Sequence, residues 1–141
     1  MTDISKNIIR VSEQITTAAR LHHRDPSSIK LVAVSKTKPA DMIRQASASG
    51  LTHIGESFVQ ESVEKIAVLK DLDLCWHFIG PIQSNKTRQI AENFHWVHSV
   101  GSLKVARRLS NQRPVDLAPL NLCVQVNISG EASKSGVSPT D

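Results

Sequence analysis

The 141-residue sequence contains no tyrosine, only two cysteines and no long hydrophobic run. Cys75 and Cys123 lie far apart in apolar segments, without a CxxC or Cys/His spacing. We therefore expect core packing in a reducing compartment, with neither a disulfide nor a zinc ion. Charges at Asp3, Lys6 and Arg10 exclude an ordinary signal peptide, and no later stretch approaches transmembrane length. These absences predict a cytoplasmic protein without a membrane partner.

The chain also lacks the motifs of several large enzyme classes. It has no GxxxxGKS/T, GxGxxG, HExxH or GxSxG segment, so a nucleotide-dependent enzyme or a hydrolase has no support. The formal charge is +4 and the basic residues are scattered, which argues against a nucleic-acid partner and favours a small anionic one. A hydrophobic content of 40% is ordinary for a globular protein and predicts one domain over residues 1–141.

Strand-like and helix-like segments alternate along the chain. An amphipathic helix with apolar residues at spacings of three and four comes first, and the Asp25-Pro26 pair closes it off. The fifth strand is continuously apolar, which predicts burial on both faces. The expected strands cover residues 31–34, 51–55, 74–79, 95–100 and 120–126, and the expected helices cover residues 4–19, 39–50, 59–69, 84–94 and 103–109.

This alternation predicts right-handed βαβ units and a parallel sheet, the α/β class. Five such strands fit either an open doubly wound sheet or the first five units of a (β/α)₈ TIM-type barrel, which typically needs about 250 residues. The chain stops at Ser138-Pro139-Thr140-Asp141, where a capping serine and a following proline are typical of a helix start. We therefore expect an incomplete barrel of about five βα units.

Lys36 is the first candidate functional residue. The apolar run Leu31 to Val34 leads directly into Ser35-Lys36, which places the lysine at the carboxyl end of a buried strand, where α/β proteins carry their chemistry. A lysine partly desolvated at the rim of an apolar core favours the neutral amine, which forms an imine with an aldehyde cofactor. The alternative is a solvated lysine in a strand-to-helix loop, because lysine is mostly a surface residue.

Other polar residues recur at equivalent places in the later units. Glu56, His77, Ser99 and Asn127 fall at or just past the ends of successive strands, and this common rim is the usual active-site face. Each also has an ordinary explanation, since a serine caps helices and a lone histidine in a strand is often a hydrogen-bonded core residue. Their recurrence favours the rim site.

Four segments resemble the pyridoxal phosphate homeostasis protein family in the same order, over essentially the whole chain. They are Ala33 to Lys38, Ile54 to Glu61, Trp76 to Lys86 and Gln125 to Gly136. The resemblance implies a (β/α)₈ barrel similar to the N-terminal domain of alanine racemase, with pyridoxal 5′-phosphate (PLP) held as a Schiff base on Lys36. The expected cofactor-binding residues are Lys36, Glu56, Ser57, His77, Ser99 and Asn127, with no catalytic residue and no metal ligand.

The chain departs from the family in two ways. Gly55-Glu56-Ser57-Phe58 stands where the family usually has Gly-Glu-Asn-Tyr. The family also binds the cofactor phosphate through a serine- and glycine-rich stretch in the last third of the barrel, which this sequence does not include.

Three functions follow from the resemblance. The first is a non-catalytic PLP-binding protein of intracellular PLP homeostasis, which carries or buffers the cofactor. The second is a PLP-dependent, racemase-like enzyme. Alanine-racemase-like enzymes use a tyrosine from a second domain, and this chain has no tyrosine. The third is an inert fragment of the family. Open sheet edges would in each case favour self-association.

Overall fold

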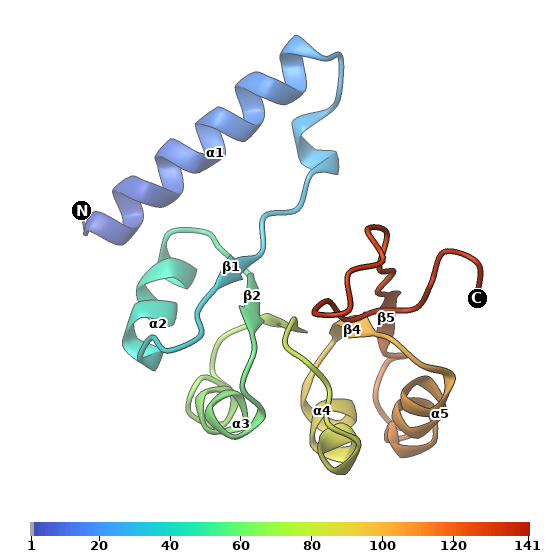
Figure 1. Cartoon of the computed structure of the whole chain (residues 1–141). Helices are drawn as coiled ribbons and strands as arrows, with labels where there is room; N and C mark the ends of the chain where they lie inside the picture. The colour runs from blue at the N-terminus through green and yellow to red at the C-terminus, as the bar shows by residue number, and fades with distance from the viewer. Residues whose placement is uncertain (1) are drawn as a thin grey trace.

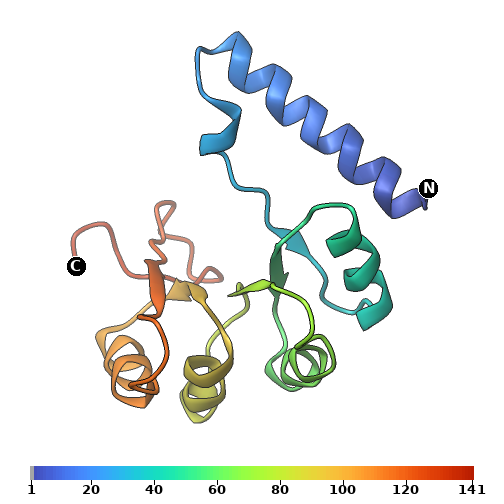
Figure 2. The same cartoon turned by 180° about the vertical axis from the view of Figure 1, so that it is seen from behind.

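The strands form a single parallel sheet that curves into an arc with helices on its outer side (Figures 1 and 2). The computed structural model describes residues 2–141. Each strand pairs with the next one in the chain, in the order β1-β2-β3-β4-β5. The strands are β1 (Ala33–Val34), β2 (His53–Glu56), β3 (Cys75–Phe78), β4 (Trp96–Val100) and β5 (Asn121–Val124).

The consecutive strand order decides between the two expected architectures. A doubly wound sheet reverses its strand order at a switch point, whereas a (β/α)₈ barrel adds its strands in sequence. The observed order is that of a barrel, so the prediction of an α/β fold with an incomplete barrel of five parallel strands is confirmed.

Helices connect the strands as the sequence predicts, with small shifts at their ends. Pro39 is the N-cap of its helix rather than a residue of the first turn, and Asp25 caps a short 3₁₀ helix instead of ending the first helix directly. The α-helices are α1 (Asp3–Leu21), α2 (Ala40–Ala48), α3 (Val59–Val68), α4 (Thr87–Asn93) and α5 (Leu103–Gln112), and the 3₁₀ helices are η1 (Pro26–Ser28) and η2 (Ser84–Lys86).

The last strand and the chain end differ from the expectation. β5 is not buried on both faces, because it lies at the edge of the sheet and leaves Leu122 and Val124 exposed. Residues Ser138–Asp141 form a turn instead of a helix start, in which the backbone N–H of Ser138 donates to the Asp141 carboxylate at 3.0 Å.

The core fills the space between the outer face of the sheet and the helices. Side chains alternate along a strand, so Trp76 and Phe78 point to the helices while His77 between them points to the inner face of the arc. Phe78 and Phe94 meet edge to face with ring centroids 5.2 Å apart. The buried cluster comprises Ile43, Ile54, Leu69, Leu74, Trp76, Phe78, Ile90, Ala91, Phe94, Val97, Val100 and Leu109.

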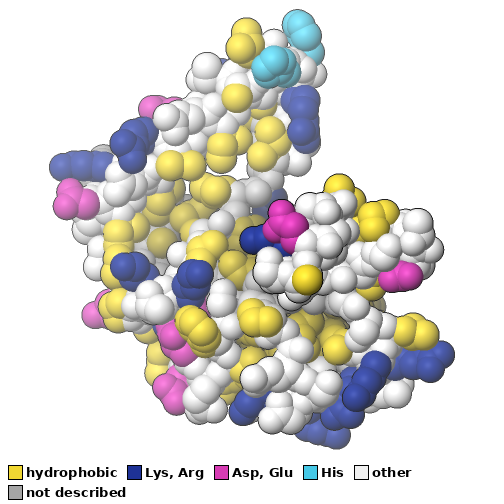
Figure 3. Space-filling model, viewed as in Figure 1, with side chains coloured by type: hydrophobic (Ala, Val, Ile, Leu, Met, Phe, Trp, Pro, Cys, Tyr) yellow, Lys and Arg dark blue, Asp and Glu magenta, His cyan; other side chains and the backbone are white. Residues whose placement is uncertain are grey.

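Helix α1 lies against α2 and β1, on the side of the arc away from α3, α4 and α5 (Figure 1). An apolar cavity of about 300 Å³ separates α1 from the sheet, with Ile8, Val11, Leu31 and Met42 in its wall. Figure 3 shows hydrophobic side chains gathered along this cleft. Within residues 2–141, no helix is long and apolar enough to cross a membrane.

Candidate functional site

The loop that carries Lys36 begins where the parallel ladder between β1 and β2 ends. The backbone N–H of Ser35 donates to the carbonyl of Gly55 at 2.9 Å, which extends the pairing up to the residue before Lys36. Lys36 therefore lies at the carboxyl end of β1, but its side chain is exposed. The expected partial burial is wrong, because Lys36 lies beyond the last residue of β1, in the loop that leads to α2.

Two contacts from α3 hold this loop in place. The backbone N–H of Thr37 donates to Glu61 Oε1 at 2.7 Å, and Lys65 Nζ donates to the carbonyl of Ser35 at 2.8 Å. Thr37 adopts a φ of 63°, a left-handed conformation that is unfavourable for a β-branched residue. Backbone strain of this kind persists where the surroundings fix the conformation, and it clusters at functional sites. Lys36 thus stands on a loop whose course is fixed on both sides.

Glu56 is buried beneath the loop instead of lying open on the rim. Its Oε1 atom accepts hydrogen bonds from Ser35 Oγ at 2.5 Å and from Lys65 Nζ at 2.8 Å. Its Oε2 atom is also buried and has no hydrogen-bond partner in the described chain. Glu56 faces α3 because side chains alternate along β2, and its hydrogen bonds to Ser35 and Lys65 lie directly below the loop of Lys36.

Sequence reasoning did not identify the two residues of α3 that complete this network. Lys65 also lies 2.5 Å from Glu61 Oε1, and this hydrogen bond lowers the pKa of the Glu61 carboxyl. The four-residue spacing of Glu61 and Lys65 on a helix was the available signal. That spacing indicates an ion pair on the helix surface, however. The burial of Lys65 follows only from the side of β2 on which Glu56 lies.

His77 lies on the inner face of the sheet, one residue before the end of β3, and is 2% exposed. Both ring nitrogens face other imidazoles: Nε2 lies 2.9 Å from His53 Nδ1, and Nδ1 lies 2.8 Å from His98 Nε2. The ring also stacks on Trp96. Burial lowers the pKa of His77 to about 4, with a smaller effect from the neighbouring histidines. These contacts fit the core alternative that the sequence left open.

Ser57 and Ser99 meet through Gly80. The Ser99 hydroxyl donates to the carbonyl of Gly80, and a Cβ atom at residue 80 would overlap the carbonyl oxygen of Ser57. Glycine is required here by the close approach of the two backbones. The ends of β2, β3 and β4 are therefore held together at the rim.

The side chain of Asn127 forms hydrogen bonds within the loop that follows it. Its amide nitrogen donates to the carbonyl of Glu131 at 3.0 Å, and its side-chain oxygen accepts from the backbone N–H of Gly130 at 3.1 Å. The backbone N–H of Asn127 donates to the carbonyl of Val137 at 2.8 Å. The structure thus places Asn127 near the end of β5 but does not bring its side chain to Lys36.

A hollow of about 490 Å³ opens at the carboxyl ends of β3, β4 and β5. Its wall combines apolar residues such as Ile82 with glycines and serines, and Ser102 among these serines is the N-cap of α5. Ile79, on the side towards β2, would contact a Cβ placed on Gly55 at 3.3 Å. The other lining residues are Gly80, Pro81, Ile82, Ser99, Gly101, Val105, Gln125, Ser135 and Gly136.

Serines line part of the hollow, and the exposed primary amine of Lys36 stands at the end of β1, so polar groups gather at the strand ends where α/β proteins bind ligands. Fold and rim together define the class: a (β/α) barrel that presents its ligand-binding face at the carboxyl ends of its strands.

Comparison with known proteins agrees with this class. The chain is 60% identical over 141 residues to the pyridoxal phosphate homeostasis protein of Pseudomonas aeruginosa and 49% identical over 140 residues to that of Escherichia coli. These alignments cover 100% and 97% of the chain but only 61% and 60% of the relatives. The chain is therefore similar along its whole length to pyridoxal phosphate homeostasis proteins and spans about three fifths of the length of these relatives. No protein-family model matches the chain.

Solved structures show the same relationship. PipY of Synechococcus elongatus, whose structure was determined with PLP bound, superposes with a TM-score of 0.74 at 43% identity and covers 90% of this chain and 59% of PipY. Alanine racemase of Corynebacterium glutamicum superposes with a TM-score of 0.61 at 18% identity, over 97% of this chain and 36% of the racemase. The second likeness shows the shared barrel fold alone.

Proposed function

We propose that this chain binds PLP without catalysing a reaction and contributes to the intracellular homeostasis of that cofactor. When bound, PLP supplies an aldehyde that forms a Schiff base with a lysine amine. The observation that carries the proposal is the position of Lys36, an exposed amine at the carboxyl end of β1 on a loop fixed by Glu61 and Lys65. PipY, a relative of the same fold, binds PLP.

Lys36, not Lys38, is the proposed attachment residue. The hydrogen bond of Thr37 to Glu61 fixes the backbone next to Lys36, so the lysine starts from a defined position at the end of β1. Lys38 lies further along the turn, directly before Pro39. Ser99 donates to the carbonyl of Gly80, and the backbone of Ser57 lies against the same glycine. The hollow beside them is lined in part by serines, whose hydroxyls can donate to an anion.

The proposed absence of catalysis rests on the state of the acid–base candidates. A second proton-transfer group must face the substrate beside the lysine in a racemase-like mechanism. Glu56 is enclosed by Ser35 and Lys65, and both nitrogens of His77 face other histidines. The curated relatives carry the name of homeostasis proteins, which fits a carrier or buffer of the cofactor.

Borohydride reduction tests the attachment. The 141-residue chain is incubated with PLP, reduced and digested, and the pyridoxyl group is located by peptide mass mapping. We expect the adduct on Lys36, with loss of the imine absorbance in Lys36→Ala and its retention in the matched control Lys38→Ala. An adduct mainly on Lys38, or undiminished absorbance in Lys36→Ala, would contradict the assignment. Absence of any adduct would instead favour the inert fragment.

A second measurement tests the absence of catalysis. Exchange of the Cα proton of L-alanine in D₂O, followed by NMR, should be no faster with the PLP-loaded chain than with free PLP. Faster exchange that Lys36→Ala abolishes would establish the enzyme alternative.

We also propose a cytoplasmic location, because both cysteines are free thiols. Nucleic acid is not a proposed partner, since the basic residues do not form a stripe. Self-association through the exposed edge of β5 is proposed on the basis of its exposed apolar side chains.

A further inference from the structure

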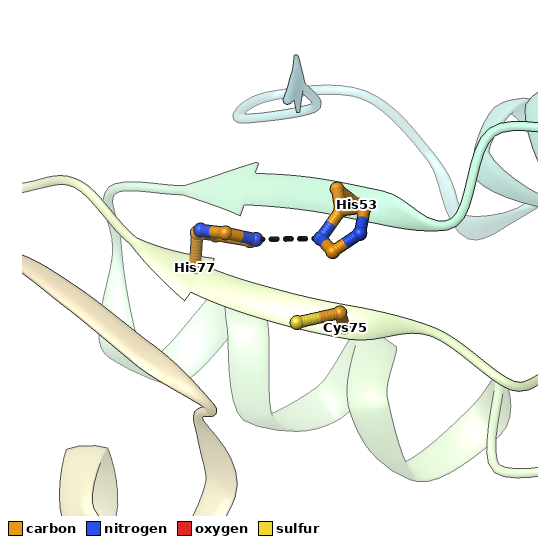
Figure 4. A group of neighbouring side chains, drawn as sticks. All are labelled: His53, Cys75 and His77. Carbon is orange, nitrogen blue, oxygen red and sulfur yellow. Dashed lines mark hydrogen bonds between the residues drawn. The ribbon is translucent and has the colours of Figure 1, made fainter. Parts of the chain in front are cut away.

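A cluster of two histidines and a cysteine lies on the inner face of the sheet, away from the Lys36 loop. His53 is the first residue of β2 and Cys75 the first residue of β3, and the register of the two strands places them opposite each other. His77 follows two residues later on the same face of β3, with its ring directed towards His53 (Figure 4). His53 and Cys75 thus open their strands, and His77 lies one residue before the end of β3, whereas Lys36 lies in the loop beyond β1.

The donor atoms of these three side chains are close enough for a shared ion. His53, Cys75 and His77 each offer one ligand atom within 4.8 Å of the other two, and His53 Nδ1 lies 2.9 Å from His77 Nε2. Tetrahedral zinc, with bonds of about 2.0–2.1 Å to nitrogen and about 2.3 Å to sulfur, separates two nitrogens by about 3.4 Å and a nitrogen from a sulfur by about 3.5 Å. Side-chain movements of a few tenths of an ångström to about one ångström convert the observed cluster into this arrangement.

We propose that His53 Nδ1, Cys75 Sγ and His77 Nε2 bind one zinc ion on the inner face of the sheet, with the fourth coordination position open. Imidazole nitrogen and thiolate sulfur are the donors that zinc prefers, whereas magnesium and calcium require oxygen donors. The site is independent of the proposed PLP function, because Lys36 takes no part in it. It also departs from the expectation of a metal-free protein that the sequence spacing suggested.

The protonation states of the histidines favour metal binding. Zinc binds the uncharged imidazole ring, and burial lowers the pKa of both His53 and His77, which disfavours the cationic form of each ring. Burial raises the pKa of the Cys75 thiol, so the thiol must lose its proton to solvent when the ion binds. Zinc therefore replaces one thiol proton, and the site gains the negative charge that offsets part of the charge of the ion.

His98 is the positioning residue of the site. Its Nε2 atom lies 2.8 Å from Nδ1 of His77, the ring nitrogen that does not face His53. When His77 Nε2 binds the ion, the ring proton resides on Nδ1 and is donated to His98. Such outer hydrogen bonds fix the tautomer and orientation of a ligating histidine.

The positive charge of Lys30 disfavours the binding of a cation at the cluster. Its ammonium group lies over the ring of Trp96, 5.5 Å from the ring centroid, and its charge contributes to the lowered pKa of His53 and of His77. The same charge repels a divalent cation at the cluster. Replacement of Lys30 by glutamine should therefore raise zinc affinity, which distinguishes a cation site from a cluster that only packs.

A competition titration tests the proposal. The metal-stripped 141-residue chain is titrated with Zn²⁺ in the presence of a chromophoric chelator, and with Co²⁺ as a spectroscopic probe. We expect one ion per chain and a thiolate-to-cobalt charge-transfer band that is lost in Cys75→Ala. Zinc affinity should fall by at least about tenfold in His53→Gln and in His98→Phe, and His98→Gln, which keeps a hydrogen-bond acceptor, should restore most of it.

Matched controls separate this site from adventitious binding and from the PLP site. Cys123→Ala removes the other cysteine, His22→Gln removes an exposed histidine at the end of α1, and Lys36→Ala removes the proposed PLP attachment; all three should bind zinc as the unmodified chain does. Circular dichroism verifies that each variant is folded, and the cobalt spectrum of the unmodified chain reports the thiolate without any substitution. Absence of the charge-transfer band, or zinc binding unaffected by His53→Gln and lost in His22→Gln, would overturn the proposal.

Discussion

The ammonium group of Lys65 lies 2.8 Å from the Oε1 atom of Glu56, and both side chains are buried beneath the loop that carries Lys36. Lys65 reaches this position from α3, and the same ammonium group donates to the carbonyl of Ser35 at 2.8 Å. The pair therefore connects the end of β2, the first residue after β1 and the helix between β2 and β3. Whatever binds at Lys36 binds to a loop anchored by this pair.

Removal of one partner of the pair should destabilise the fold strongly. In Lys65→Met the carboxylate of Glu56 stays buried without its counter-charge, and breaking a buried pair in this way costs about 3–5 kcal/mol. Urea unfolding followed by circular dichroism measures the loss. The double variant Lys65→Met, Glu56→Gln should lose less stability than the sum of the two single variants, because no uncompensated charge remains. Additive losses would show that the two groups do not interact.

The folded chain should be more stable with glycine than with alanine in place of Thr37. Its φ of 63° lies in the left-handed region, where a side chain costs about 1–2 kcal/mol. Both substitutions remove the hydroxyl, so the comparison isolates the conformational cost, which is reduced by the greater freedom of glycine in the unfolded chain. We expect Thr37→Gly to exceed Thr37→Ala by up to about 1 kcal/mol in the free energy of unfolding. Equal stabilities would mean that this loop relaxes in solution.

The metal-free chain should lose stability as the pH falls from about 6.5 to about 4. Burial lowers the pKa of His77 to about 4 from an ordinary value of 6.5, so in this interval the unfolded chain binds a proton that the folded chain excludes. The contribution is fully present above pH 6.5, is lost progressively below it and amounts to about 3 kcal/mol at most. Chemical denaturation at a series of pH values with a chelator present measures it. His77→Gln should show a shallower slope over the same interval, and an unchanged slope would exclude His77 as its origin.

The edge strand β5 should drive self-association. Val124 is 64% exposed on this strand, and unpaired strand edges with apolar side chains pair with other chains. Val124→Lys should lower the average mass measured by light scattering at a given concentration. Val115→Lys is the matched control, since Val115 is fully exposed in the segment between α5 and β5 and should leave the mass unchanged. A monodisperse monomer for the unmodified chain would refute the role of the edge.

The order of helices and strands was predictable because it depends on local patterns. Apolar spacing of three to four residues marked the helices, and short apolar runs marked all five strands in their correct order. Burial was less predictable, because it depends on neighbours that the pattern does not specify. The apolar run through β5 indicated a strand buried on both faces, and its place at the edge of the sheet leaves Val124 exposed.

In the candidate site, too, the positions of residues were predictable from local sequence patterns, whereas their burial and contacts were not. The position of Lys36 after the first strand followed from the sequence, but its exposure did not. The role of Glu56 depends on the face of β2 that it occupies, and a shift of one residue in register would have turned it to the inner face. His53, Cys75 and His77 belong to two strands, and only their register brings them together. Their separation along the chain matched no metal-binding spacing, so sequence reasoning did not group them.

Because every strand pairs with the strand that precedes it, the sheet grows in the order in which the chain is synthesised. Each new βα unit finds its partner strand already made, but every parallel pair closes only across a connecting helix, and such long-range pairing slows folding. On the ribosome, β2 can add to β1 and β3 to β2 before later strands emerge. During synthesis the growing sheet thus always exposes the edge of its newest strand, and that edge is the template for the next unit.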